Sequence, residues 1–112
     1  MMTSSSIKSQ LFIDGQFVNS EAGATIDVVN PHDGSLISKV AEGRAEDIDK
    51  AVAAARKAFP GWRDTSAAQR GDLIRKLADK LEENFEEMCL LESLDTGHPL
   101  RDTRFLDVRR TI

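Results

Sequence analysis

A long amphipathic stretch in the second half of the chain limits most strictly what this sequence can fold into. Ser66 followed three residues later by Gln69 is typical of a capping box, so we expect a helix to begin there. It should run through about Ser93, and Gly97 is the expected stop. Apolar residues recur along it at helical spacing, and they are Leu73, Ile74, Leu77, Leu81, Phe85, Met88 and Leu91. Such a stripe needs an apolar partner surface.

Short strands precede this helix. Asp14-Gly15 lies between two apolar triplets and predicts a tight hairpin, because a type I′ turn needs positive φ at both central positions. β-Branched residues before Asn30-Pro31 favour another strand, and Asp33-Gly34 supplies a further turn. The predicted strands span about 11–13, 16–19, 26–29 and 35–40.

Two more helices are predicted. One begins at Ala45, with Glu46 and Asp47 in its first turn, and should end at Pro60-Gly61. Another begins at Leu100, where apolar residues again recur at spacings of three and four. The short strands offer too little surface to cover the amphipathic helices. This balance favours a piece of a larger α/β domain over a self-sufficient one.

The charge balance excludes some classes of partner. Lys and Arg number 15 and Asp and Glu number 19, for a net charge of −4, which gives no reason to expect nucleic acid or an anionic membrane. No apolar run is long enough to cross a bilayer. Residues 1–10 are Ser/Thr-rich and are interpreted as a flexible tail rather than a secretory signal. The single cysteine, Cys89, fits a reducing, cytoplasmic compartment.

Few residues offer chemistry. No glycine-rich phosphate loop, paired-cysteine motif or zinc-protease motif occurs. Cys89 could be a nucleophile, but its place beside the apolar stripe favours packing. His32 and His98 both favour surface or capping roles. Asp95 is either a local hydrogen-bonding group or a cation ligand. The charges of Arg101–Arg110 favour a solvated helix face with i,i+3 pairs over an interface.

Four segments together resemble the amino-terminal part of the aldehyde dehydrogenase superfamily. They are LFIDGQFV, VVNPHDGSLISKVAEG, AEDIDKAVAAARKAFPGW and RGDLIRKLADKLEENFEEMCLLESLDTGHPL. The resemblance runs from about Leu11 to the end, and it departs from the common LDTGKP pattern by His98 in place of lysine. It implies an α/β fold in which residues 11–112 are the amino-terminal part of an NAD(P)-binding domain.

The resemblance also implies the parent enzyme's activity. That enzyme would oxidise a small-molecule aldehyde to a carboxylic acid with NAD or NADP, using a catalytic cysteine and a glutamate base. None of those catalytic or cofactor-binding residues maps onto this sequence, and Cys89 does not align with the nucleophile. The chain alone is therefore expected to be inactive. A homodimer or homotetramer is implied for the parent enzyme.

One site carries over from the family. Many members bind a monovalent cation, potassium or sodium, through two backbone carbonyls before Asn-Pro and the aspartate of LDTG. Here those positions are Val28, Val29 and Asp95. Carbonyl and carboxylate oxygens suit hard cations.

Two other interpretations stay open. The chain could be a short interaction module or pseudoenzyme that pairs with full-length subunits. The parent could also be a related superfamily enzyme, such as a semialdehyde or acyl-CoA-forming dehydrogenase.

Overall fold

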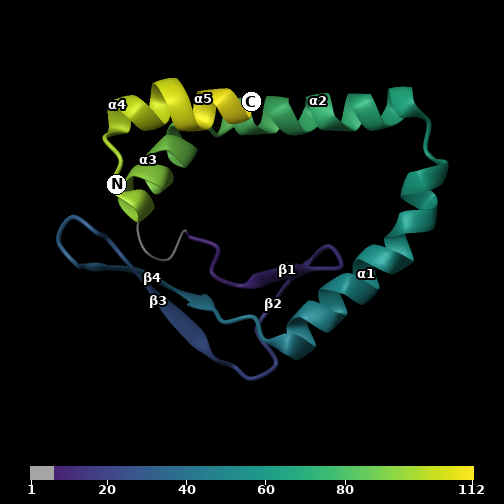
Figure 1. Ribbon diagram of the computed structural model, residues 1–112, viewed down its shortest axis with the longest axis horizontal. Coiled ribbons are helices and arrows are strands. Elements are labelled where there is room, and N and C mark those ends of the chain that lie inside the picture. Colours follow the sequence, from purple (N-terminus) through teal and green to yellow (C-terminus); the bar gives the residue numbers. More distant parts are fainter. Residues whose placement is uncertain (1–6) are drawn as a thin grey trace. The chain divides into compact units, whose positions relative to one another are not determined.

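The computed structural model describes residues 7–112 as two compact units. The first holds the residues up to Val28 together with Leu36–Asp64, and the second holds Val29–Ser35 and Thr65–Ile112. The strands belong mainly to the first unit, and all helical segments after Thr65 belong to the second (Figure 1). Residues 1–6, the greater part of the predicted tail, lie outside the described residues.

The first two strands form the predicted hairpin. Strand β1 (Leu11–Ile13) pairs antiparallel with β2 (Gln16–Val18), so that Phe12 lies opposite Phe17. Asp14 and Gly15 have φ values of 52° and 78°, which is the pair of positive angles that a type I′ turn requires. The sequence prediction of this turn is confirmed.

The next two strands form a second two-stranded sheet. They are β3 (Thr25–Val29) and β4 (Leu36–Ala41), close to the predicted bounds. In the loop between them the N–H of Gly34 donates to the carbonyl of Asn30 at 2.7 Å, and Gly34 has a φ of 72°. The predicted turn at Asp33-Gly34 is therefore present.

Helix α1 (Ala45–Asp64) begins at the predicted residue without a conventional cap. Asp47 replaces that cap, because one of its carboxylate oxygens accepts the N–H of Arg44 and the other accepts the N–H of Glu21, each at 3.0 Å. These two backbone hydrogen bonds hold the pKa of Asp47 below its ordinary value. The side chain is almost fully buried, so one carboxylate joins the helix start to the loop after β2.

The predicted end of α1 is wrong. Pro60 lies inside the helix, which continues to Asp64. Proline lacks an N–H to donate to the carbonyl one turn earlier, but its ring holds φ near the helical value. The backbone can therefore stay helical for another turn past Pro60.

The long amphipathic segment is two helices rather than one. Helix α2 (Ala67–Glu83) has the predicted capping box between Ser66 and Gln69. It ends at Asn84, whose φ is −108° and whose side-chain amide donates to the carbonyl of Lys80 at 2.8 Å. Asparagine side chains compete in this way for helix carbonyls, which explains the break that the apolar spacing did not predict.

Helix α3 (Phe85–Thr96) follows directly, and Gly97 ends it in the left-handed conformation, as predicted. A side chain at Gly97 would come within 3.0 Å of the ring of Pro31, so the glycine also allows the loop of residues 29–35 to approach.

The predicted last helix is present but irregular. It consists of α4 (Leu100–Asp102), the π-helical segment η2 (Thr103–Asp107) and α5 (Val108–Thr111). The predicted i,i+3 pairing of its charges is wrong: Arg104 pairs with Glu86 and Arg109 with Glu82, both on the preceding helices. Arg104 and Arg109 pair with residues earlier in the chain because the preceding helices place glutamates beside them.

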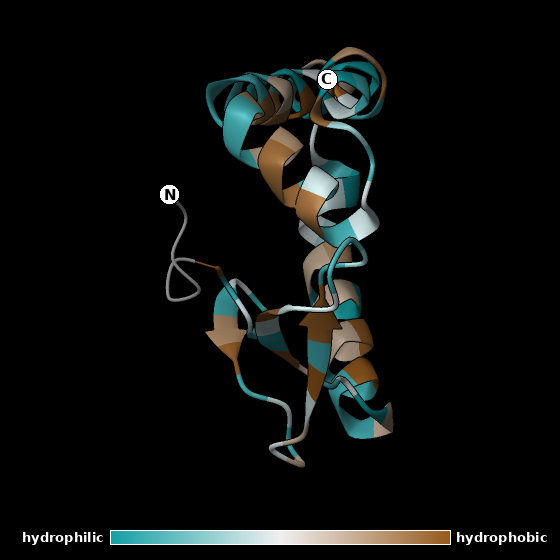
Figure 2. Cartoon of the chain, turned by 90° about the vertical axis from the view of Figure 1, so that its left-hand side faces the viewer, coloured by the Kyte–Doolittle hydropathy of each residue, from teal (hydrophilic) through white to brown (hydrophobic). Residues whose placement is uncertain are grey.

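Little apolar surface is enclosed. Among the described residues the only buried hydrophobic side chains are Cys89 and Val108. Hydrophobic stretches alternate with hydrophilic ones along the exposed helices (Figure 2). Large apolar side chains on α1 and α2 are about half exposed, and these are Ile48, Val52, Phe59, Trp62, Leu73, Ile74 and Leu77. The prediction that the helix stripes need a partner surface therefore holds for this structure.

Replacing Asp47 tests how α1 is anchored. Asp47→Asn removes the charge that two backbone N–H groups stabilise, so we expect several-fold faster hydrogen exchange at the amides of Glu21 and Arg44. The pKa of Asp47 is lower in the folded state, so its contribution to stability is present above about pH 4 and is lost as the pH falls through the folded value.

The control is Asp49→Asn, an equal charge change at an exposed position of the same helix. Equal effects of the two substitutions on exchange at Glu21 and Arg44 would contradict this role for Asp47.

Candidate functional site

The residues with potential chemistry do not gather in one place. His32 is exposed in the loop after β3, where its N–H donates to the side chain of Asn30 at 2.9 Å. His98 is exposed after α3. Both positions agree with the predicted surface roles. In the described part of the chain no three His, Cys, Asp or Glu side chains form a group that could hold a metal ion.

The residues predicted for a cation site occupy two elements. Val28 and Val29 are the last two residues of β3, and Asp95 lies in the last turn of α3. Val29 and Asp95 are both exposed and belong to the second unit, whereas Val28 belongs to the first. Because no cluster of ligating side chains surrounds Asp95 among the described residues, a cation there would depend on backbone oxygens.

Cys89 lies where the sequence predicted it. Its side chain has 0 % exposure inside α3, and it forms no disulfide. A thiol without contact to solvent cannot reach a substrate and acts as a small apolar group. The geometry therefore favours packing over nucleophilic chemistry.

Among residues 7–112, a histidine side chain forms an ion-pair contact at His98. Its ring Nδ1 lies 2.9 Å from a carboxylate oxygen of Asp107. This hydrogen bond comes first among the causes that raise the pKa of His98, with the charges of Asp107, Glu92 and Asp102 acting in the same direction. The sequence did not predict the pair, because the two residues are separated by a turn and a change of helix.

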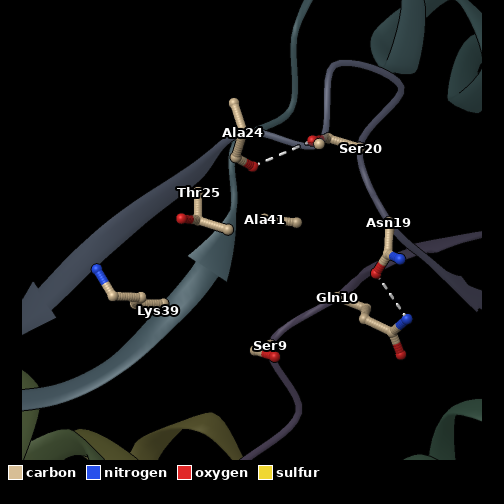
Figure 3. A pocket seen from close by; sticks show the side chains of 9 residues that line it. Ser9, Gln10, Asn19, Ser20, Ala24, Thr25, Lys39 and Ala41 are labelled. Carbon is tan, nitrogen blue, oxygen red and sulfur yellow. Dashed lines mark hydrogen bonds between the residues drawn. The ribbon is translucent and has the colours of Figure 1, made fainter.

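One polar cavity of about 270 Å³ lies in the first unit (Figure 3). Its polar groups are already engaged: the amide of Gln10 donates to Asn19 at 2.9 Å, and the hydroxyl of Ser20 donates to the carbonyl of Ala24 at 3.1 Å. Lys39, which also lines it, pairs with Asp27. A cavity whose side chains satisfy one another offers little to a ligand.

The described residues do not fit a dinucleotide. Such a site needs a glycine-rich turn that opens a helix whose first N–H groups face the pyrophosphate. Gly43 precedes α1, but the N–H of Arg44 is taken by the carboxylate of Asp47. A negative group at that helix start would repel phosphate. We therefore derive no cofactor chemistry from this part of the chain.

The reactivity of Cys89 can be measured directly, because it is the only cysteine in these 112 residues. In the folded chain we expect a thiol reagent to modify Cys89 much more slowly than in denaturant, since the sulfur must first be exposed. Rapid modification under native conditions would contradict the packing role.

Comparisons with known proteins identify the family. The model of the aldehyde dehydrogenase family matches residues 17–112. DhaS of Bacillus subtilis (strain 168), a candidate aldehyde dehydrogenase, is 48% identical over 101 residues, which are 88% of this chain and 20% of DhaS. The chain thus spans about one fifth of the length of this relative.

Solved structures agree with this. PnpE from Pseudomonas sp. WBC-3 is 60% identical with a TM-score of 0.91, covering 94% of this chain and 22% of PnpE, and PnpE has also been crystallised with nicotinamide adenine dinucleotide. An aldehyde dehydrogenase variant from Bacillus cereus is 40% identical with a TM-score of 0.90, covering 95% of this chain and 22% of its own. From the hairpin to the last helix, this chain belongs to the aldehyde dehydrogenase family.

Proposed function

We propose that this chain is the amino-terminal part of an enzyme that oxidises an aldehyde to a carboxylic acid with NAD or NADP. The observation that carries the proposal is the match of residues 17–112 to the aldehyde dehydrogenase family, at 60% identity to PnpE, which has been crystallised with the dinucleotide. In this reaction the aldehyde carbon gains a water-derived oxygen, and its hydride passes to the cofactor.

The part played by these residues is architectural. Cys89 is buried and the start of α1 is capped by its own carboxylate, so we place the nucleophile, the base and the dinucleotide loop outside residues 1–112. The half-exposed apolar side chains of α1 and α2 supply a surface for the remainder of the enzyme to cover. Burying this surface would favour assembly at roughly 25 cal/mol per Å² of apolar area.

A monovalent cation is part of the proposal. Potassium or sodium would be held by the carbonyl oxygens of Val28 and Val29 and the carboxylate of Asp95. The exposure of Asp95 leaves that carboxylate open to a ligand, and the ring of Pro31, which lies 3.0 Å from where a Cβ at Gly97 would be, supports an approach of the loop after β3 to the end of α3. The role of the cation would be to stabilise the fold.

The surroundings of the enzyme are also proposed. We propose a cytoplasmic homodimer or homotetramer; the single cysteine, Cys89, which forms no disulfide, supports a reducing compartment. No helix in residues 7–112 is long and apolar enough to span a membrane.

Enzyme activity tests the main proposal. We expect the purified full-length protein to form reduced nicotinamide from an aldehyde and NAD or NADP, with kcat unchanged within about twofold in Cys89→Ser because that thiol is not the nucleophile. Separate assays with coenzyme A added would show an acyl-CoA-forming enzyme instead. No turnover with a panel of aldehydes would favour the interaction module.

Cation binding has its own test. If Asp95 is a ligand, potassium or sodium should raise the thermal midpoint of the full-length protein more than choline does at equal ionic strength, and Asp95→Ala should abolish that difference. Asp79→Ala, which removes an exposed carboxylate from α2, is the control. A cation-specific shift that persists in Asp95→Ala would refute the site.

A further inference from the structure

The backbone around His98 is held in place from both sides. The N–H of His98 donates to the hydroxyl of Thr96 at 3.2 Å, and its carbonyl accepts the hydroxyl of Ser93 at 2.7 Å. Gly97 donates to the carbonyl of Ser93 as well. These hydrogen bonds fix the backbone of His98 at the end of α3. They thereby limit the directions in which its side chain can extend.

From this position the ring reaches the last residue of the π-helical segment. Its Nδ1 lies 2.9 Å from a carboxylate oxygen of Asp107, which is only partly exposed. The segment η2 is closed by the N–H of Val108, which donates to the carbonyl of Thr103. Single π-helical turns have poorer packing than α-helix and commonly accompany functional adjustments. The contact between His98 and Asp107 therefore holds η2, the least regular part of the second unit, against the end of α3.

Two other ion pairs of the described residues join the same region to the preceding helices, and neither contains a histidine. Arg104 pairs with Glu86 of α3, and Arg109 pairs with Glu82 of α2 and lies over the ring of Phe85, 4.4 Å from its centroid. Among the ion pairs of the described residues that join η2 and α5 to the preceding segments, His98–Asp107 is the one that contains a histidine, the side chain whose ordinary pKa lies nearest neutral pH.

We propose that His98 and Asp107 form a pH-dependent latch, which holds η2 against the end of α3 while the imidazole is protonated and loosens as it loses its proton. The charged groups that face the ring are Asp107 of η2, Glu92 of α3 and Asp102 of α4, and all three are acids. A neutral ring can still donate from Nδ1, but it loses its attraction to these carboxylates. The latch therefore weakens rather than disappears.

The direction of the pH effect follows from the contact. The pKa of His98 is higher in the folded state than its ordinary value near 6.5. The stabilisation is fully present below that ordinary value and is lost as the pH rises through the folded one. Loosening would free the segment that carries Phe105 and Leu106. The side chains of these two residues are 73% and 44% accessible in this structure.

Hydrogen exchange in the full-length protein tests the latch. The probe is the amide of Val108, whose hydrogen bond closes η2. At about one pH unit below the ordinary histidine pKa, His98→Gln should exchange about two- to fivefold faster than the wild type, and well above the folded pKa that difference should shrink, because a neutral ring keeps only its hydrogen bond. Comparing variants at the same pH removes the intrinsic dependence of exchange on pH.

Matched variants decide the outcome. His98→Lys keeps a positive charge throughout, so its protection at Val108 should not decline between the two pH values. His32→Gln removes the other histidine and should leave Val108 unchanged. Asp107→Asn should match His98→Gln at low pH. The latch is refuted if wild type and His98→Gln exchange equally at low pH, or if the advantage of the wild type is as large at high pH as at low pH.

Discussion

Hydrogen bonds between near neighbours, rather than an enclosed core, define the elements of this structure. Only Cys89 and Val108 are buried hydrophobic residues in the described part of the chain, so packing cannot be what selects each turn and helix end. Instead, the type I′ turn at Asp14-Gly15 and the capping box at Ser66 set their own geometry locally. Such interactions contribute about 1 kcal/mol each and can specify an element without a partner surface.

This constraint explains which features could be predicted from the sequence. Turns and caps depend on residues within three or four positions, so Asp14-Gly15, Ser66 with Gln69, and Gly97 were all recognisable from local patterns. The family resemblance extended this to the fold class, which the structural comparisons support. The exposed apolar faces agree with the expectation of a piece of a larger domain.

Features that depend on competition between local effects were not predictable in this way. Pro60 could end α1 or be accommodated in it, and apolar spacing does not distinguish these outcomes. Asn84 interrupts a stripe that remains continuous in sequence, because its side chain takes a helix carbonyl. The π-helical segment leaves the apolar period almost unchanged, so no pattern in the sequence indicated it.

Side-chain pairs between different helical segments were also not predictable from the sequence. His98 and Asp107 are nine residues apart and meet only because Gly97 reverses the chain, and the partners of Arg104 and Arg109 lie on earlier helices. Within the first unit, Asp47, which looked like a dipole-compensating acid, accepts a hydrogen bond from Glu21 in the loop after β2. The i,i+3 and i,i+4 rules apply to pairs within one helix and do not predict contacts between segments.

We propose that residues 7–112 are a structural part of a larger dehydrogenase whose remainder covers α1 and α2. Hydrogen exchange of these two helices, measured in the full-length enzyme and in the 112-residue chain, tests it most directly. We expect strong protection in the full-length enzyme and weak protection in the chain alone, since the apolar faces are exposed without a partner. Equal protection in both would contradict it.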